Sequence, residues 1–114
     1  MTPRDLVLLQ GTLDFLVLRA LSWGPMHGYA VAQFIRDGSD GSFRILDGAL
    51  YTALHRMEER RWLTAEWGTS EKGKNAKFYS LTPAGRRAMR AETASWERYV
   101  AAVAGVVRAS TATA

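Results

Sequence analysis

The chain has 114 residues, of which 47% are hydrophobic, and a formal net charge of +4. This length allows one domain and is too short for two ordinary hydrophobic cores. The chain contains no cysteine, which excludes a disulfide framework and a thiolate metal site. No signal peptide is predicted, because charged residues precede the first apolar run and no small-residue cleavage pattern follows it. Polar residues interrupt that run, so it is a poor membrane span, and we expect a cytoplasmic protein.

The positive charge is concentrated in one third of the chain. Residues 56–90 contain nine bases and four acids, a net of +5, whereas the remainder contains six bases and seven acids, a net of −1. A local basic surface of this kind indicates contact with a phosphate backbone. The alternative is a solvated face whose arginines serve solubility.

The first part of the sequence predicts two helices. The first runs from Pro3 to about Leu21, since proline suits the first turn of a helix. Its apolar residues point to nearly all sides, which is more than one small domain can cover and indicates a partner subunit. A turn at residues 23–26 separates it from a shorter helix, from His27 to about Arg36. A polar loop follows at residues 37–42, and residues 43–45 are a candidate for one short strand.

The middle of the chain predicts a third helix and a hairpin. Asp47 is a suitable N-cap, because its carboxylate can accept hydrogen bonds from the first free backbone N–H groups, and the helix extends to about Arg60. Its buried stripe has three- and four-residue spacing and consists of Leu50, Ala53, Leu54 and Met57. Residues 62–67 and 77–81 have the alternation of strands. The polar, lysine-bearing residues 68–76 between them form a wing.

The last helix is predicted to start at Pro83, with Thr82 as its cap, and to end near Arg108. At 1.5 Å per residue it is about 39 Å long. Several of its apolar residues are seven apart, as in paired helices. The predicted dimer interface combines this helix with part of the first and consists of Leu9, Leu13, Met89, Trp96, Tyr99, Val100, Val103 and Val106.

This order of elements predicts a winged helix-turn-helix, mainly α with a small β-hairpin (α+β). Residues 1–82 form the DNA-binding region, residues 83–108 the dimerisation helix of the same domain, and residues 109–114 a frayed tail. In such a fold, the N-terminal part of the third helix meets base edges in the major groove of duplex DNA, and lysines of the wing bind phosphates.

Small and polar residues occupy that part of the third helix, so its backbone can approach the DNA and its side chains can hydrogen-bond to bases or phosphates. The candidate DNA contacts are Gly48, Tyr51, Thr52, His55, Arg56, Lys72, Lys74 and Lys77. The alternatives are a half-buried core ring for Tyr51, an ordinary exposed face for its polar neighbours, and a wing without a role in DNA binding.

Catalysis is not expected. His27 and His55 are the only histidines, and the sequence has no HExxH pattern and no glycine-rich phosphate loop. We therefore predict no metal site and no cofactor. Trp96 is a candidate for binding a small molecule, since a gap at the dimer seam would hold a planar ligand against its indole. The alternative is that Trp96 is only an anchor of the interface or core.

The chain resembles the PadR family of bacterial transcriptional regulators over nearly everything from Leu8 to about Val107. The resemblance is carried by QGTLDFLVLRAL at residues 10–21, HGYAV at 27–31, DGALYTALHRMEE at 47–59 and FYSLTPAG at 78–85. No single motif is specific, but the four in this order and spacing are strong together. The length is similar to that of the short subfamily with one long C-terminal helix.

The resemblance implies a homodimeric winged helix that represses promoters. In some members, a planar aromatic compound bound at the dimer interface relieves repression. The resemblance also places Gly48, Tyr51 and Thr52 in the recognition-helix motif of the family, and Lys74 and Lys77 in its basic wing.

Two residues depart from the family pattern. Thr52 stands where proline is usual, which adds a hydrogen-bonding group and predicts a different sequence preference. Arg61 stands where glycine usually ends the helix, and a left-handed cap is strained for arginine.

We therefore predict a homodimeric repressor of a near-palindromic operator, with a small planar aromatic compound as its candidate effector. The alternative is a winged helix that acts as a protein-interaction or RNA-binding module without promoter-specific repression.

Overall fold

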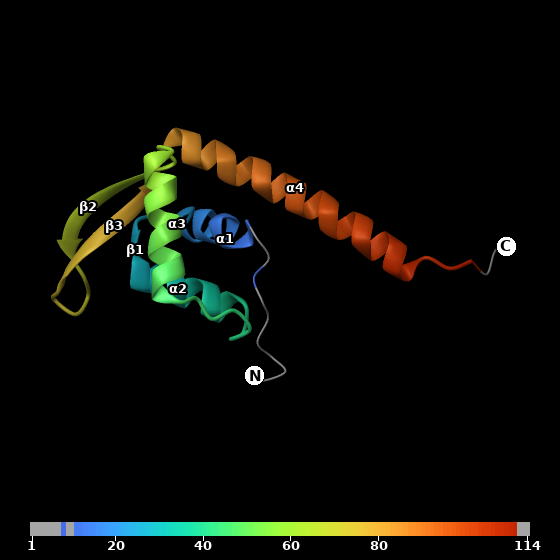
Figure 1. Ribbon diagram of the computed structural model, residues 1–114, viewed down its shortest axis with the longest axis horizontal. Helices are drawn as coiled ribbons and strands as arrows, with labels where there is room; N and C mark the ends of the chain where they lie inside the picture. The colour runs from blue at the N-terminus through green and yellow to red at the C-terminus, as the bar shows by residue number, and fades with distance from the viewer. Residues whose placement is uncertain (1–7, 9–10, 112–114) are drawn as a thin grey trace.

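The computed structural model describes residue 8 and residues 11–111, and every structural statement below concerns these residues. Three short helices form the body of the molecule, a β-hairpin projects from one side, and one long helix extends away from the body (Figure 1). This architecture confirms the predicted class, mainly α with a small antiparallel sheet. The elements are α1 (Thr12–Leu21), β1 (Met26–His27), α2 (Gly28–Gly38), α3 (Asp47–Glu59), β2 (Leu63–Thr69), β3 (Asn75–Leu81) and α4 (Pro83–Arg108).

The hydrophobic core lies where α1, α2 and α3 meet the hairpin and the first turns of α4. All four residues of the predicted stripe on α3 are buried. The other buried apolar residues come from every remaining helix and from β2 and β3: Val17, Leu18, Ala20, Leu21, Val31, Ile35, Leu63, Tyr79 and Met89. The core thus fixes α3 by one face and leaves its opposite face outward.

The sheet has three strands in the order β1-β3-β2, all antiparallel to their neighbours. The hairpin register pairs Leu63 with Leu81 and Thr69 with Asn75, so both strands are longer than predicted and the wing loop is correspondingly shorter. The third strand is β1, which pairs with residues 78–79 of β3. The strand expected at residues 43–45 is wrong, because that segment has no regular secondary structure and pairs with no strand of the described residues. β1 has two residues, too few for an alternation pattern.

Two helix starts differ from the predictions. α1 begins at Thr12, after Gly11 in a left-handed conformation with φ 87°, and Leu8 lies outside it. The remaining residues of its predicted N-terminal part, 3–7 and 9–10, lie outside the described residues. Asp47 is not the N-cap of α3: Leu46 holds that position without a side-chain hydrogen bond, and its carbonyl accepts from the Leu50 N–H at 3.0 Å. Asp47 is the first helical residue, where its negative charge interacts favourably with the positive end of the helix dipole.

α3 ends in a Schellman motif built on an arginine. The Trp62 N–H donates to the Met57 carbonyl at 3.0 Å, and the Arg61 N–H donates to the Glu58 carbonyl at 2.9 Å. Arg61 is left-handed, with φ 63°. Arg61 thus has the left-handed conformation that is expected to be strained for an arginine.

The start of α4 is fastened to this same turn. The Thr82 hydroxyl donates to the Arg61 carbonyl at 2.7 Å and accepts from the Gly85 N–H at 3.0 Å, which caps α4 as predicted. The Thr82 N–H also donates to the Trp62 carbonyl at 3.0 Å. A Cβ on Gly85 would lie 2.1 Å from the Trp62 carbonyl oxygen, so only glycine allows this approach. We name the contact of residues 61–62 with residues 82–85 the junction.

Replacement of Gly85 by alanine should destabilise the protein by about 3 kcal/mol, because the backbone of Trp62 or of α4 must move to admit a methyl group. Urea denaturation measures the change. Gly105→Ala is the matched control on the same helix, since a Cβ there meets nothing within 4 Å, and it should be neutral or stabilising. Equal stability of the two variants would contradict the packing at the junction.

Replacement of Arg61 by glycine should stabilise the protein by about 1 kcal/mol, because glycine adopts the left-handed conformation without a steric cost. The shift in the midpoint of urea denaturation measures it. The control is Arg60→Gly, since Arg60 has φ −76° and gains nothing from glycine. A glycine at position 61 that fails to raise the midpoint would show that Arg61 is not strained.

Candidate nucleic-acid interface

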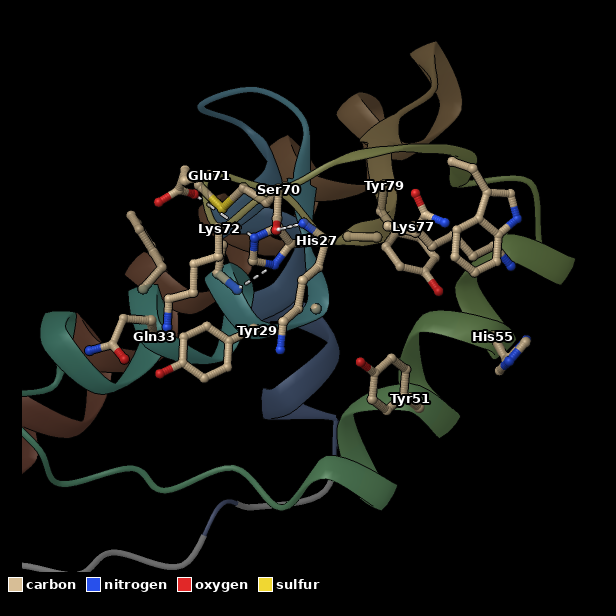
Figure 2. A pocket seen from close by; sticks show the side chains of 18 residues that line it. His27, Tyr29, Gln33, Tyr51, His55, Ser70, Glu71, Lys72, Lys77 and Tyr79 are labelled. Atoms are coloured by element: carbon tan, nitrogen blue, oxygen red, sulfur yellow. Dashed lines mark hydrogen bonds and ion pairs between the residues drawn. The ribbon is translucent and has the colours of Figure 1, made fainter.

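The outer face of α3 carries the predicted base-contacting residues. Gly48, Thr52 and His55 are exposed, and a Cβ on Gly48 would meet nothing within 4 Å. Figure 2 shows Tyr51 and His55 extending from α3 among the side chains that line one pocket. This face is therefore accessible along its whole N-terminal half.

Tyr51 is both half-buried, as the core interpretation predicts, and partly open to solvent, as a DNA contact requires. Its side chain is 47% exposed, and its ring lies against the first residue of α2, where a Cβ on Gly28 would be 3.2 Å from the hydroxyl oxygen. The absence of a side chain at Gly28 makes room for this ring. Tyr51 thus fills the space between α3 and α2 while one side of it stays open to solvent.

Arg56 is paired with a residue of α1. Its guanidinium forms an ion pair and hydrogen bond with the carboxylate of Asp14 on α1, and the two side chains are 41% and 18% exposed. The pair links the C-terminal half of α3 to α1. Arg56 therefore has a partner within the chain, unlike the exposed residues at the start of the helix.

The wing loop is a tight structure that presents two lysines. The Ser70 N–H donates to the Lys74 carbonyl at 2.8 Å, and Gly73 is left-handed with φ 76°. Lys72 and Lys74 are exposed, and the Lys72 Nζ lies 5.8 Å from the centroid of the Tyr29 ring. The Lys72 amine therefore lies beside the N-terminal turn of α2.

Lys77 differs from the two loop lysines. Its Nζ lies 3.6 Å from Glu58 Oε1 on α3 and 5.7 Å from the ring centroid of Tyr79. The charge of Lys77 is thus partly balanced before any partner binds. Burial raises the pKa of the Tyr79 hydroxyl, and the nearby Glu58 and Tyr51 raise it further.

His27 connects α2 to the wing. Its Nδ1 accepts a hydrogen bond from the Ala30 N–H at 3.2 Å and so caps α2. Its ring forms a T-shaped pair with Phe78 at a centroid distance of 5.3 Å, and its Nε2 lies 3.9 Å from Glu71 Oε1 in the wing loop. His27 therefore contacts the wing as well as the start of α2, beside the contact of Lys72 with Tyr29.

A groove of about 750 Å³ lies between the wing, α2 and α3 (Figure 2). Residues of α3, Tyr51 and His55, line one side, and Lys72 and Lys74 of the wing line another. The predicted helix contacts and wing contacts therefore border one open surface. No group of three or more potential metal ligands is found within the described part of the chain.

Two arginines at this surface escaped sequence analysis. Arg36 and Arg44 line a second hollow of about 280 Å³, next to Tyr51 and between α2 and α3. The charge count pointed to residues 56–90 and so passed over both. Their positions on either side of the polar loop at residues 37–42 were the available signal.

The predicted dimer residues fall into two groups. Met89 is buried in the core of the subunit, where Sδ accepts a hydrogen bond from the Arg19 guanidinium at 3.3 Å, and Leu13 packs against the same core. Leu9 lies outside the described residues. The apolar residues further along α4 are exposed: Trp96, Tyr99, Val100, Val103 and Val106.

The fold has counterparts among known proteins. The model of the transcriptional regulator PadR-like family matches residues 17–91, which span most of the body, the hairpin and the start of α4. The chain belongs to the PadR-like family of transcriptional regulators. It is accordingly a DNA-binding regulator, and the resemblance noted in the sequence is confirmed.

Solved PadR structures extend the similarity to most of the chain. A PadR family transcriptional regulator from Eggerthella lenta is 30% identical, with a TM-score of 0.73 over 89% of this chain and 86% of that chain. A PadR-like regulator from Bacillus cereus has the same fold, with a TM-score of 0.78 at 20% identity, over 90% of this chain and 97% of that one. An uncharacterized protein in a Streptomyces fradiae transposon is 41% identical over 85 residues, which cover 75% of this chain and 23% of that protein.

No helix in the described part of this PadR-like chain has the length and hydropathy needed to cross a membrane.

The Arg56–Asp14 pair predicts a stability role for Arg56. A double-mutant cycle with Asp14→Ala and Arg56→Ala should give a coupling of about 1 kcal/mol in the free energy of unfolding, because both groups are partly shielded from water. Urea denaturation of the four proteins measures it. The Glu58–Lys77 pair on the hairpin side is the comparison, since its side chains are similarly exposed, at 34% and 32%. A coupling energy near zero would show that the ion pair does not stabilise the fold, and Arg56 would then be available for a role on the outer face of α3.

Proposed function

We propose that this PadR-like regulator is a cytoplasmic homodimeric repressor that binds a near-palindromic operator. The observation that carries the proposal is the common surface formed by the outer face of α3 and the wing lysines around one groove (Figure 2). A helix face and a flanking cationic loop are what a winged helix needs to place one helix in the major groove and the loop on adjacent phosphates.

The N-terminal half of α3 is proposed to read bases. Gly48 lets the backbone approach the groove, and the Thr52 hydroxyl and the His55 imidazole provide hydrogen-bonding groups at the surface. Tyr51 is held by its contact with Gly28 and offers its hydroxyl from a fixed position. Arg36 and Arg44, at the neighbouring hollow, would bind phosphates next to the start of α3.

Dimerisation is proposed to use the exposed apolar face of α4. Trp96 and Val103 are 49% and 46% exposed, and Val106 is 78% exposed. This part of the helix lies beyond the body (Figure 1), where nothing in the same subunit covers it among the described residues. A second copy would bury this face, and two-fold symmetry would then set half-sites about 34 Å apart or a multiple of that.

Repression is proposed to follow from blocking polymerase at the operator. Trp96 and Tyr99 stack with a centroid distance of 6.1 Å and an interplanar angle of 27°. In a dimer these rings would face the seam, where a planar aromatic effector would bind between subunits. Such an effector would act by shifting the relative positions of the two recognition helices.

The loop lysines should carry most of the salt dependence contributed by the wing. Replacing Lys72 and Lys74 by alanine in both subunits of the dimer should make the slope of log K against log salt less steep by about 3.6, since four phosphate contacts are lost and each contributes about 0.9. Lys77→Ala should change the slope less, because Glu58 already balances that charge. Fluorescence anisotropy of a labelled duplex at four salt concentrations measures the slopes. An unchanged slope in the double variant would remove the wing from the interface.

The repressor proposal is tested by comparing a palindromic fragment from the protein's own promoter with a random duplex of equal length. We expect the palindrome to bind at least about 1,000-fold more tightly at physiological salt, with two subunits per duplex by sedimentation. Equal affinity for both duplexes would contradict the proposal. Tighter binding to RNA, or no nucleic-acid binding, would favour the alternative of an RNA-binding or protein-interaction module.

A further inference from the structure

Exposed arginines gather around the junction, away from the wing loop and the start of α3. Two of them follow the end of α3 and three lie on the first turns of α4: Arg60, Arg61, Arg86, Arg87 and Arg90. The hydrogen bond from the Thr82 hydroxyl to the Arg61 carbonyl, 2.7 Å long, brings the two segments together. We name these five arginines the arginine patch.

The three arginines of α4 share one side of the helix. Arg86 and Arg90 are four positions apart and therefore neighbours on the helix surface, and Arg87 lies next to them. Gly85 and Met89 are also four positions apart, and both are buried against the body of the subunit. The burial of that other side leaves the side with the arginines open to solvent.

The positive charge of the arginine patch is not balanced within the described part of the chain. No ion pair there joins any of its five guanidinium groups to a carboxylate. Residues 59–62 and 82–92 contain these five arginines and two glutamates, Glu59 and Glu92, which gives a net charge of +3. The first turn of α4 has no acidic residue, so the positive end of the helix dipole adds to the same field. The patch therefore attracts anions.

The chemistry of the arginine patch fits a phosphate backbone better than a protein or a membrane. No large exposed apolar side chain of the described residues lies in either of its two segments, and none of its arginines lines the two hollows described above. A protein interface has an apolar, aromatic-rich centre, and a helix on a membrane surface inserts apolar side chains. Guanidinium groups on an open surface match the phosphates of a duplex, which need neither.

The arginine patch and the proposed DNA-reading surface lie at opposite ends of α3 (Figure 1). Gly48 is near the start of this helix, Arg60 directly follows its end, and its 13 residues span about 20 Å. The tip of the wing lies toward the same end as the start of α3, whereas α4 begins at the other end (Figure 1). A duplex held by the start of α3 and the wing thus leaves the patch free.

We propose that the arginine patch binds the phosphate backbone of a second DNA duplex without sequence preference, so that one protein bridges two DNA segments. Bridging rests on the proposed function, because the first duplex is held by the start of α3 and the wing. Binding of a duplex to the patch does not depend on that function. The two statements are therefore tested separately.

Bridging is tested by capture of a random duplex on an immobilised operator. The palindromic fragment from the protein's own promoter is attached to beads and loaded with the full chain, and a labelled random duplex is added after a wash. We expect the wild-type protein to capture the random duplex, with less captured as the salt concentration rises. Failure of the loaded wild-type protein to capture it at low salt would overturn bridging.

Variants assign the capture to the arginine patch. Arg86→Gln combined with Arg87→Gln should weaken capture of the random duplex about ten-fold, since two exposed charge contacts are lost and each contributes a factor of about three. The affinity for the palindrome should stay unchanged. Arg98→Gln combined with Arg108→Gln removes the same charge further along α4 and should capture as the wild type does. All four side chains are exposed, so both variants should keep the urea midpoint of the wild type. Equal capture by the two double variants would overturn the assignment.

A further measurement needs no operator. With Lys72 and Lys74 replaced by alanine, random-duplex binding by the full chain is followed by anisotropy at four salt concentrations. Adding Arg86→Gln and Arg87→Gln should make the slope of log K against log salt less steep by about 1.8, because one duplex loses two phosphate contacts at one patch. An unchanged slope would overturn phosphate binding by the patch.

The outcomes separate this proposal from the repressor function and from other anionic partners. A preference for the palindrome without capture of a second duplex would keep the repressor function and overturn bridging. A slope that depends on Arg86 and Arg87 without any preference for the palindrome would keep the patch and overturn the repressor function. Vesicles of phosphatidylserine and phosphatidylcholine test a membrane surface. Vesicle binding that is lost in the Arg86→Gln, Arg87→Gln variant while duplex capture is kept would overturn the proposal.

Discussion

The approach of the α4 backbone to the Trp62 carbonyl determines how the other parts of the molecule are arranged. Gly85 has no side chain at the point where a methyl group would lie 2.1 Å from that oxygen. Thr82 bonds to both Arg61 and Trp62 from the other side of the contact. The end of α3, the start of β2, the end of β3 and the start of α4 therefore meet within a few residues. This contact helps to orient the wing and the long helix relative to α3, together with the packing of Met89 on α1 and the Lys77–Glu58 pair.

The junction also explains why a strained residue is kept at the end of α3. A left-handed Arg61 turns the chain so that the Trp62 carbonyl points at the start of α4. The conformation costs about 1–2 kcal/mol for a residue with a Cβ. The hydrogen bonds of Thr82 and the Schellman pair offset that cost. The strain is thus confined to Arg61, and the hydrogen bonds around it are formed.

Much of the fold could be predicted from the sequence because its signals are local. The Thr82–Pro83 start of α4, the apolar stripe of α3 and the alternation on both sides of the wing are read from neighbouring residues. β1 could not be predicted, since it exists only through its pairing with a strand some fifty residues later. The prediction of Asp47 as the N-cap of α3 is wrong, because a good capping side chain does not determine which carbonyl accepts the first hydrogen bond of the helix.

The candidate site shows the same limit. Residue types identified the exposed polar face of α3 and the wing lysines, but not their partners. The side chain of Arg56 meets Asp14 from a helix forty-two residues away, and Lys77 meets Glu58, so neither is equivalent to Lys72. Met89 fits a heptad spacing with Trp96 and yet belongs to the core, because α4 packs on α1 only through its first turns. The groove itself arises from three elements and has no signature in any one of them.

One residue, Thr82, separates β3 from α4, and both elements are held at the junction. The 26 residues of α4 are thus a lever arm about 39 Å long whose pivot is the base of the wing. A tilt of about 10° at the pivot displaces the far end by about 7 Å by this geometry. A partner bound to the far end of α4 is therefore connected through this helix to the wing and to α3. A small rotation at the start of the helix corresponds to a large displacement at its end.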